Sequence, residues 1–265
     1  MSNRAPIGVF DSGVGGLTVA AAIRRALPNE TLVYLGDTAR VPYGTKSGDV
    51  VRRYAVRCAE FLRRQEAKML VIACNTASAH AIETLRATFP VPIVGVIEPG
   101  AQLAARTTKN GRIGVIGTEG TITSRSYQRA LMALAPNAQV FAAPCPLFVP
   151  LAEEGMVDHA ATRLIAQEYL APLVAHGIDT LVLGCTHYPL LKPTLAGVVG
   201  STVQLVDSAN AVAEATRLVL QDAGLATDAR HGDDRFYATD VGQRVLRVGR
   251  AFMGEGLDKV ELVDL

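Results

Sequence analysis

LVIACNT (Leu70–Thr76) is an apolar run that ends in a cysteine and two polar residues, and it recurs as LVLGCTH (Leu181–His187). Further pairs of segments match in the same order and at nearly the same separation along the chain. They are IGVFDSG (Ile7–Gly13) with IGVIGTE (Ile113–Glu119), Val41–Pro42 with Val149–Pro150, and Val96–Glu98 with Leu205–Asp207. A single match could arise by chance, because strand ends resemble each other. The ordered set indicates a duplicated unit.

Short apolar runs alternate with helix-period segments along the whole chain, which predicts an α/β fold with mainly parallel strands. The clearest helix spans 49–64, where apolar side chains such as Val51 and Leu62 share one face, with Ser47 as the N-cap. The predicted strands are Ile7–Phe10, Thr31–Leu35, Met69–Ala73, Ile93–Ile97, Ile113–Ile116, Gln139–Ala142, Thr180–Leu183, Val203–Val206, Arg235–Ala238 and Lys259–Val263.

The duplication predicts two similar α/β domains, related by a pseudo-twofold axis, with mainly parallel sheets flanked by helices. Residues 1–98 with 208–265 would form the first domain, and residues 99–207 the second. Ligands of such folds bind at the carboxyl ends of strands. The active site is therefore expected in the cleft between the domains. Cys74 and Cys185, as equivalent positions, would approach a ligand there from opposite sides.

The composition excludes several classes of protein. The chain has 265 residues, is 49% hydrophobic and has a net charge of +1, so nothing in it favours a nucleic-acid partner. Its apolar runs are short and broken by Gly, Pro or Asp, which argues against a transmembrane helix or a membrane partner. The N-terminal residues lack the apolar region of a signal peptide. We therefore expect a cytoplasmic protein whose four cysteines are reduced thiols.

The first cysteine motif is Cys74-Asn75-Thr76, directly after a predicted strand. Asn75 or Thr76 can cap the helix that follows. A cysteine at a helix N-terminus lies at the positive end of the helix dipole, which favours the thiolate. The alternative is that Cys74 is only a small buried apolar residue.

The second motif is Cys185-Thr186-His187-Tyr188-Pro189, at the matching strand end. His187 could form a hydrogen bond with the thiol, and Pro189 suits the first turn of a helix. A Cys-x-His pair could also be half of a metal site, but no companion Cys-x-x-Cys or His-x₃-His spacing accompanies it, so no metal is expected. A structural cap or core histidine is the third possibility.

Two kinds of loop complete the candidate site. Asp11-Ser12-Gly13-Val14-Gly15-Gly16 follows the first strand, and its backbone could bind an anion. Its G-x-G-G spacing departs from the dinucleotide-binding pattern. Asp11 could assist a thiol or simply form a turn. In the loop Val41–Gly44, Tyr43 and Gly44 could contact a ligand. In the matching loop Val149–Gly155, a carboxylate at Glu153 or Glu154 would lie on the Cys185 side.

Taken together, these motifs resemble the glutamate racemases. The resemblance covers essentially the whole chain, and His187 separates it from aspartate racemases, which typically carry Glu at that position. The segments that carry it are FDSGVGGLTV (Phe10–Val19), GDTARVPYG (Gly36–Gly44), ACNTASA (Ala73–Ala79), FVPLAEEG (Phe148–Gly155), GCTHYPLL (Gly184–Leu191), DRFYATD (Asp234–Asp240) and VELVDL (Val260–Leu265).

The resemblance implies cofactor-independent racemisation of glutamate that supplies D-glutamate for peptidoglycan synthesis, in an enzyme that is often a homodimer. It implies that Cys74 deprotonates D-glutamate, assisted by Asp11, and that Cys185 deprotonates L-glutamate, assisted by Glu153 and His187. Inversion at a carbon needs a proton removed from one face and returned to the other, which suits two such groups. The positions that match substrate-binding residues are Asp11, Ser12, Tyr43, Gly44, Asn75, Thr76, Thr186 and His187.

Two other functions remain compatible with the sequence. The nearest is an enzyme of the same superfamily that acts on aspartate or another acid. The other is a non-catalytic α/β module that binds a nucleotide or an acidic ligand through Asp11–Gly16. Such a module would have no need for matched cysteines.

Overall fold

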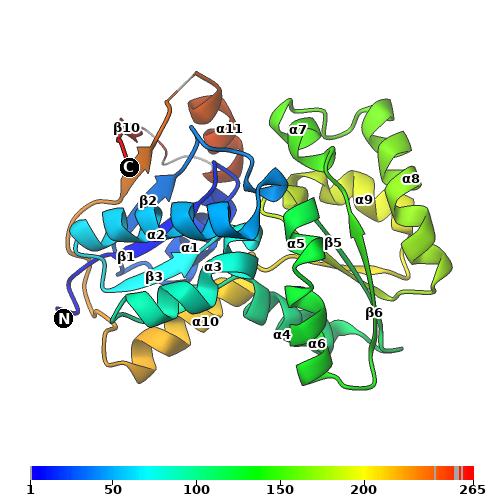
Figure 1. Cartoon of the computed structure of the whole chain (residues 1–265), viewed down its shortest axis with the longest axis horizontal. Helices are drawn as coiled ribbons and strands as arrows, with labels where there is room; N and C mark the ends of the chain where they lie inside the picture. The colour runs from blue at the N-terminus through cyan, green and yellow to red at the C-terminus, as the bar shows by residue number, and fades with distance from the viewer. Residues whose placement is uncertain (1, 242, 254–256, 258) are drawn as a thin grey trace. The chain divides into compact units, whose positions relative to one another are not determined.

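The computed structural model describes residues 2–241, 243–253, 257 and 259–265 (Figure 1). The chain divides into two compact units, Met1–Val96 with Ala209–Leu265, and Ile97–Ser208. Each unit contains one parallel sheet flanked by helices, so the predicted α/β fold is confirmed. No helix in the described part of the chain is both long enough and apolar enough to span a membrane.

The first unit contains a six-stranded parallel sheet in the order β10-β9-β2-β1-β3-β4. Its strands are β1 (Ile7–Asp11), β2 (Leu32–Gly36), β3 (Met69–Ile72), β4 (Ile93–Gly95), β9 (Arg235–Ala238) and β10 (Glu261–Leu262). β1 pairs with both β2 and β3, with Phe10 opposite Leu35 on one side and Ile72 on the other. The loops after β1 and β3 therefore leave the same edge of the sheet.

The helices of the first unit pack in groups, α2 against α3 and α1 against both α10 and α11. They are α1 (Leu17–Ala26), α2 (Gly48–Arg64), α3 (Asn75–Thr88), α10 (Ala209–Asp222), α11 (Gln243–Met253) and the short 3₁₀ helix η1 (Tyr43–Thr45). Buried side chains of α2 and α3 share one apolar core with Phe10, Leu35 and Ile72 of the sheet. Cys74, which follows β3, is part of the same core and is held by this packing.

The predicted helix boundaries are largely confirmed. α2 begins at Gly48, and the Oγ atom of Ser47 accepts a hydrogen bond from the Val50 N–H at 3.4 Å. The predicted strand Ile93–Ile97 is wrong at its end, because β4 stops at Gly95 and a helix begins at Ile97. The Ser78 hydroxyl accepts the Val96 N–H at 3.3 Å, which takes that group out of the strand pairing.

The second unit contains a four-stranded parallel sheet in the order β6-β5-β7-β8. Its strands are β5 (Arg112–Gly117), β6 (Gln139–Pro144), β7 (Thr180–Gly184) and β8 (Gln204–Val206). Its helices are α4 (Ile97–Thr107), α5 (Glu119–Thr123), α6 (Ser126–Leu134), α7 (Phe148–Glu153), α8 (Ala160–Ala175), α9 (Lys192–Val199) and the 3₁₀ helix η2 (Tyr188–Leu191). β7 pairs with β5 as β3 pairs with β1, which is the arrangement expected of a duplicated unit.

A buried ion pair links separate segments of the first unit. The Lys68 Nζ atom lies 2.6 Å from Glu30 Oε2, and the two side chains are 0% and 3% exposed. Lys68 Nζ also donates to the Asn3 carbonyl oxygen at 2.5 Å, and Glu30 Oε1 accepts the Thr227 N–H at 3.1 Å. The pair therefore ties the residues before β2 and before β3 to the segment that precedes β9.

Lys68→Met is expected to lower the free energy of unfolding by about 3–5 kcal/mol, because it leaves the Glu30 carboxylate buried without its cation. Urea unfolding followed by circular dichroism measures the change. The double substitution Lys68→Met/Glu30→Leu removes both charges and should recover much of the loss. A midpoint for Lys68→Met equal to that of the unaltered chain would contradict this role.

Candidate functional site

The first group of predicted site residues lies where β1 and β3 end. Asp11 closes β1, and Cys74 follows β3 after Ala73, so the pairing of these strands brings them to one edge. The Cys74 thiol donates to the Ser12 Oγ atom over 3.5 Å. Asp11, Ser12 and Cys74 are all buried, at 1%, 9% and 6% exposure. The sheet topology thus gathers a carboxylate, a hydroxyl and a thiol.

Cys74 is itself the N-cap of α3, and its Sγ atom accepts the Ala77 N–H at 3.4 Å. The prediction that Asn75 or Thr76 caps this helix is therefore wrong, because both lie within its first turn, where they are buried. A sulfur that accepts a backbone N–H at the positive end of a helix is better able to carry negative charge. The geometry thus favours a reactive thiol over a merely apolar one.

Asp11 forms the turn that the sequence allowed, because its Oδ2 atom accepts the Gly13 N–H at 3.0 Å. The Tyr34 hydroxyl donates to the Gly13 carbonyl oxygen at 2.9 Å and so also stabilises this turn. Burial raises the pKa of Tyr34 well above its usual value, and the nearby Asp11 and Cys74 add to the effect. Tyr34 therefore stays neutral beside these two groups.

Tyr43 and Gly44 lie in η1 and are buried. The Tyr43 hydroxyl donates to Asp37 Oδ2 at 2.5 Å and lies 3.8 Å from the Cys58 Sγ atom. Burial raises the pKa values of Tyr43 and Cys58, so both keep their protons. The hydroxyl of Tyr43 is thus engaged inside the first unit, and Cys58 is a buried core thiol.

The second group of site residues lies at the end of β7. The Cys185 Sγ atom is 3.9 Å from His187 Nδ1, and His187 Nε2 is 3.0 Å from Glu153 Oε1. Cys185 and His187 are buried, whereas the Glu153 side chain, at the end of α7, is 19% exposed. A thiol, an imidazole and a carboxylate in series form the arrangement by which a histidine exchanges a proton with a thiol and is itself oriented.

Comparison with known proteins identifies the family. The model of the Asp/Glu/hydantoin racemase family matches residues 9–216. The chain belongs to this family. It is 52% identical to a glutamate racemase of Syntrophus aciditrophicus over 261 residues, covering 98% of this chain and 97% of the relative. The chain is therefore a racemase, an isomerase.

Solved structures agree with the family assignment. Glutamate racemase RacE1 of Bacillus anthracis superposes with a TM-score of 0.95 at 40% identity, covering 99% of this chain and 98% of that one. The glutamate racemase of Francisella tularensis, solved with D-glutamate, gives a TM-score of 0.93 at 37% identity and the same two coverages. The fold of this racemase is therefore that of the glutamate racemases.

The sequence allows three roles for His187, namely a hydrogen-bond partner of the thiol, a metal ligand, and a structural cap or core histidine. His187 precedes η2 but its side chain makes no capping hydrogen bond, and it contacts Glu153 instead. Among the residues that the structure describes, no group of three or more His, Cys, Asp and Glu side chains could hold a metal ion. Pro189 lies in the first turn of η2, as predicted, and the buried Tyr188 hydroxyl donates to the Cys145 carbonyl oxygen at 2.7 Å. The His187 side chain therefore pairs with Glu153 and does not cap η2.

Two residues at the strand ends of this racemase were not singled out from the sequence. Asp37 follows β2 and is fully buried, where it accepts hydrogen bonds from Tyr43 and, at 2.9 Å, from the Thr239 hydroxyl. Thr118 follows β5, caps α5 and has its Oγ1 atom 3.0 Å from Thr121 Oγ1. The internal repeat aligns Thr118 with Ser12 and is the signal that could have found it. For Asp37, only its place at a strand end was informative.

Gly184 is the last residue of β7 and precedes Cys185. A Cβ atom there would lie 2.6 Å from the Ile116 carbonyl oxygen and 3.1 Å from the Tyr127 ring. Gly184→Ala is therefore expected to destabilise this racemase by about 1–3 kcal/mol through overpacking. Differential scanning calorimetry measures the effect. Gly197→Ala on α9 is the matched control, because no atom beyond the adjacent residues and the backbone of its own helix lies within 4 Å of the added methyl. Equal melting temperatures for the two variants would contradict the prediction.

Proposed function

We propose that this racemase interconverts L- and D-glutamate without a cofactor, with Cys74 and Cys185 as paired acid and base on opposite faces of the α-carbon. The observation that carries the proposal is that both cysteines follow equivalent strands and each has polar partners of its own. The similarity to glutamate racemases over nearly the whole chain supports glutamate as the substrate.

The chemistry explains why two thiols are needed. One thiolate removes the α-proton, so that the Cα–H bond breaks, an S–H bond forms and the electron pair stays on the α-carbon, delocalised into the carboxylate. The opposite thiol then donates its proton to the other face and becomes a thiolate. We assign removal of the proton from D-glutamate to Cys74 and from L-glutamate to Cys185. Each turnover exchanges the protonation states of the two sulfurs.

The polar partners of each cysteine suit this exchange. In the first unit, the Ala77 N–H and the positive end of α3 stabilise a thiolate at Cys74, and Asp11 is the proposed assisting carboxylate. In the second, His187 exchanges the Cys185 proton and Glu153 stabilises the imidazolium, which its 3.0 Å contact permits. The two assisting devices differ, so the two half-reactions should respond differently to substitution.

Binding of the substrate is assigned to groups that surround the cysteines. Glutamate has two carboxylates and one ammonium group, so its site needs several N–H and O–H donors and at least one acceptor. Because the Tyr43 hydroxyl already donates to Asp37, we expect Tyr43 to act by positioning the backbone of Gly44. The proposed binding residues are Asp11, Ser12, Tyr43, Gly44, Asn75, Thr76, Thr186 and His187.

The test is a chiral assay of purified, reduced protein dialysed against a chelator. L-glutamate, D-glutamate, L-aspartate and a 5-substituted hydantoin are incubated separately without added cofactor. The expected result is equimolar L- and D-glutamate from either enantiomer, with little conversion of the other compounds. Racemisation of aspartate in preference to glutamate would refute the proposed substrate, and loss of activity on dialysis would refute cofactor independence.

In the cell, we propose that the enzyme acts in the cytoplasm as a homodimer and supplies D-glutamate for peptidoglycan synthesis. Expression of the chain should restore growth of a bacterial strain that requires external D-glutamate, whereas the Cys74→Ser variant should not. Sedimentation analysis of the purified protein measures the oligomeric state. Failure to restore growth with soluble, active protein would contradict the role in the cell.

A further inference from the structure

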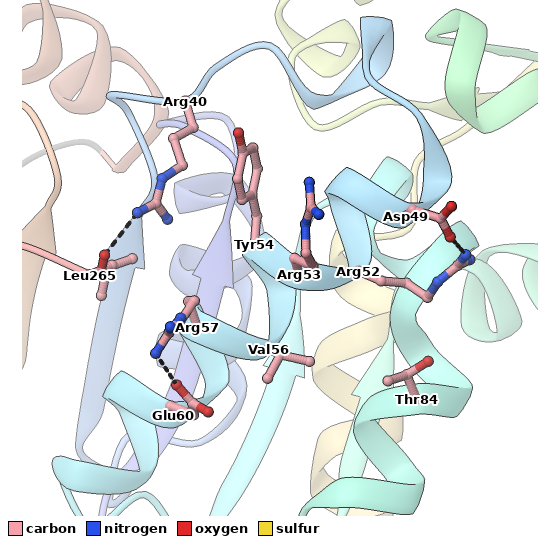
Figure 2. Close-up of a pocket in the computed structure, with 10 residues that line it drawn as sticks. All are labelled: Arg40, Asp49, Arg52, Arg53, Tyr54, Val56, Arg57, Glu60, Thr84 and Leu265. Atoms are coloured by element: carbon pink, nitrogen blue, oxygen red, sulfur yellow. Dashed lines mark hydrogen bonds and ion pairs between the residues drawn. The ribbon is translucent and has the colours of Figure 1, made fainter.

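An arginine-rich pocket lies on the outer face of α2, away from the residues assigned to catalysis. It has a volume of about 800 Å³ and is bounded by one side of α2, the loop before it, α3 and Leu265 (Figure 2). The residues that line it are Arg40, Asp49, Arg52, Arg53, Tyr54, Val56, Arg57, Glu60, Thr84 and Leu265. Four arginines and two carboxylates line this pocket, and the Arg40 Nη1 atom also lies 3.5 Å from the buried Asp37 Oδ2 atom.

The arginines of the pocket are held to different degrees. Arg52 pairs with Asp49, and Arg57 pairs with Glu60 at 3.4 Å; the two partners of each pair are three residues apart on α2 (Figure 2). Such exposed pairs contribute little stability and can be displaced by a stronger anion. Within the described part of the chain, Arg53 has no ion pair, and Figure 2 shows its guanidinium extended into the pocket between Tyr54 and Arg52.

One wall of the pocket is more rigid. The Arg40 Nη2 atom donates to the Leu265 backbone oxygen at 3.0 Å, and its guanidinium lies 5.0 Å from the centre of the Tyr54 ring. Tyr54 in turn packs against Tyr43, with ring centres 5.6 Å apart. Arg40 is therefore held at one end of the pocket, while the more exposed arginines of α2 can adjust at the other.

We propose that this pocket binds a phosphate-bearing anion, with Arg53 as its principal donor and Arg57 and Arg40 beside it. Arg53 and Arg57 are one turn apart on α2, about 6 Å along the axis. Figure 2 shows their guanidinium groups pointing away from each other, so Arg57 has to turn from Glu60 before both groups contact one ligand. The planar, permanently charged fork of arginine matches phosphate oxygens better than the ammonium of lysine does. The Thr84 side chain adds a hydroxyl donor at the edge.

The test is isothermal titration calorimetry of the full chain with inorganic pyrophosphate at low ionic strength. Saturable binding at one site is expected for the unaltered protein, and Arg53→Gln should weaken it by roughly tenfold, the loss of one charged hydrogen bond. Arg25→Gln is the matched control, because Arg25 is an exposed arginine at the end of α1 of the same unit. It removes the same charge and should leave the affinity unchanged.

Three outcomes overturn the proposal. They are the absence of saturable binding, equal affinities for Arg53→Gln and the unaltered chain, and equal losses in Arg53→Gln and Arg25→Gln, which would indicate attraction by net charge alone. Circular dichroism of each variant confirms the fold, which substitution of these exposed arginines should not disturb. Glutamate added at the same concentration as pyrophosphate should not compete, so the result is independent of the proposed substrate.

Discussion

Cys185→Ser and Cys74→Ser are each expected to lower racemisation by roughly 10²- to 10⁴-fold, the usual contribution of a positioned acid or base. Serine has nearly the shape of cysteine, so the fold should survive, but its hydroxyl is too weak an acid to form the required anion near neutral pH. Chiral chromatography of glutamate measures the turnover, and circular dichroism checks the fold. Both directions should be lost, because each turnover uses both sulfurs.

The other cysteines serve as internal controls. Burial raises the pKa of the Cys58 and Cys145 thiols, so neither is a ready base. Cys145→Ser should therefore keep most of the turnover, even if its buried hydroxyl lowers stability. Near-normal turnover in Cys74→Ser or Cys185→Ser would rule out the two-thiol mechanism, whereas a loss in Cys145→Ser equal to theirs would show that the assay reports folding.

The second large effect concerns the assisting groups. Asp11→Asn is expected to lower kcat by about 10²-fold mainly from D- to L-glutamate, and His187→Asn mainly from L- to D-glutamate. Enantiomers are equally stable, so kcat/KM must remain equal in the two directions and the asymmetry must be sought in kcat and KM separately. Steady-state kinetics from each enantiomer provides both constants.

Glu153→Gln and Glu154→Gln form a matched pair for the same prediction. Glu153 contacts His187 Nε2, so its substitution should follow the asymmetry of His187→Asn. Glu154→Gln, one residue further on, should resemble the unaltered enzyme. Equal changes of kcat in both directions for Asp11→Asn and His187→Asn would contradict the assignment of one assisting device to each cysteine.

The fold could be predicted largely because its strands are short, apolar and separated by amphipathic helices. Strand order was less accessible: β9 (Arg235–Ala238) pairs with β2, far away in the sequence, through contacts that no local pattern records. The end of β4 was misjudged because Val96 and Ile97 continue an apolar run, while the Ser78 hydroxyl and the start of α4 end the strand. Tertiary contacts decided that boundary.

The candidate site could be located from the sequence because its residues follow strands. The hydrogen bonds that these residues form could not be predicted in the same way. The motif at Cys74 suggested an Asn75 or Thr76 cap, whereas the sulfur itself accepts the N–H of Ala77. The sequence places Tyr43 in a loop after a strand, but it does not show that the Tyr43 hydroxyl donates to Asp37, whose burial depends on the packing of β2 and the residues after β9. The hydrogen-bond partners of these side chains depend on tertiary packing, which the periodicity of the sequence does not encode.

The most direct measurement is proton NMR and chiral analysis of L-glutamate incubated with the enzyme in D₂O, sampled early in the reaction. Two thiols that exchange with solvent should place deuterium at the α-carbon of the D-glutamate product, while the remaining L-glutamate keeps its α-proton. Early deuteration of both enantiomers, or product that retains the original proton, would indicate a single base and contradict the proposed pairing of Cys74 with Cys185.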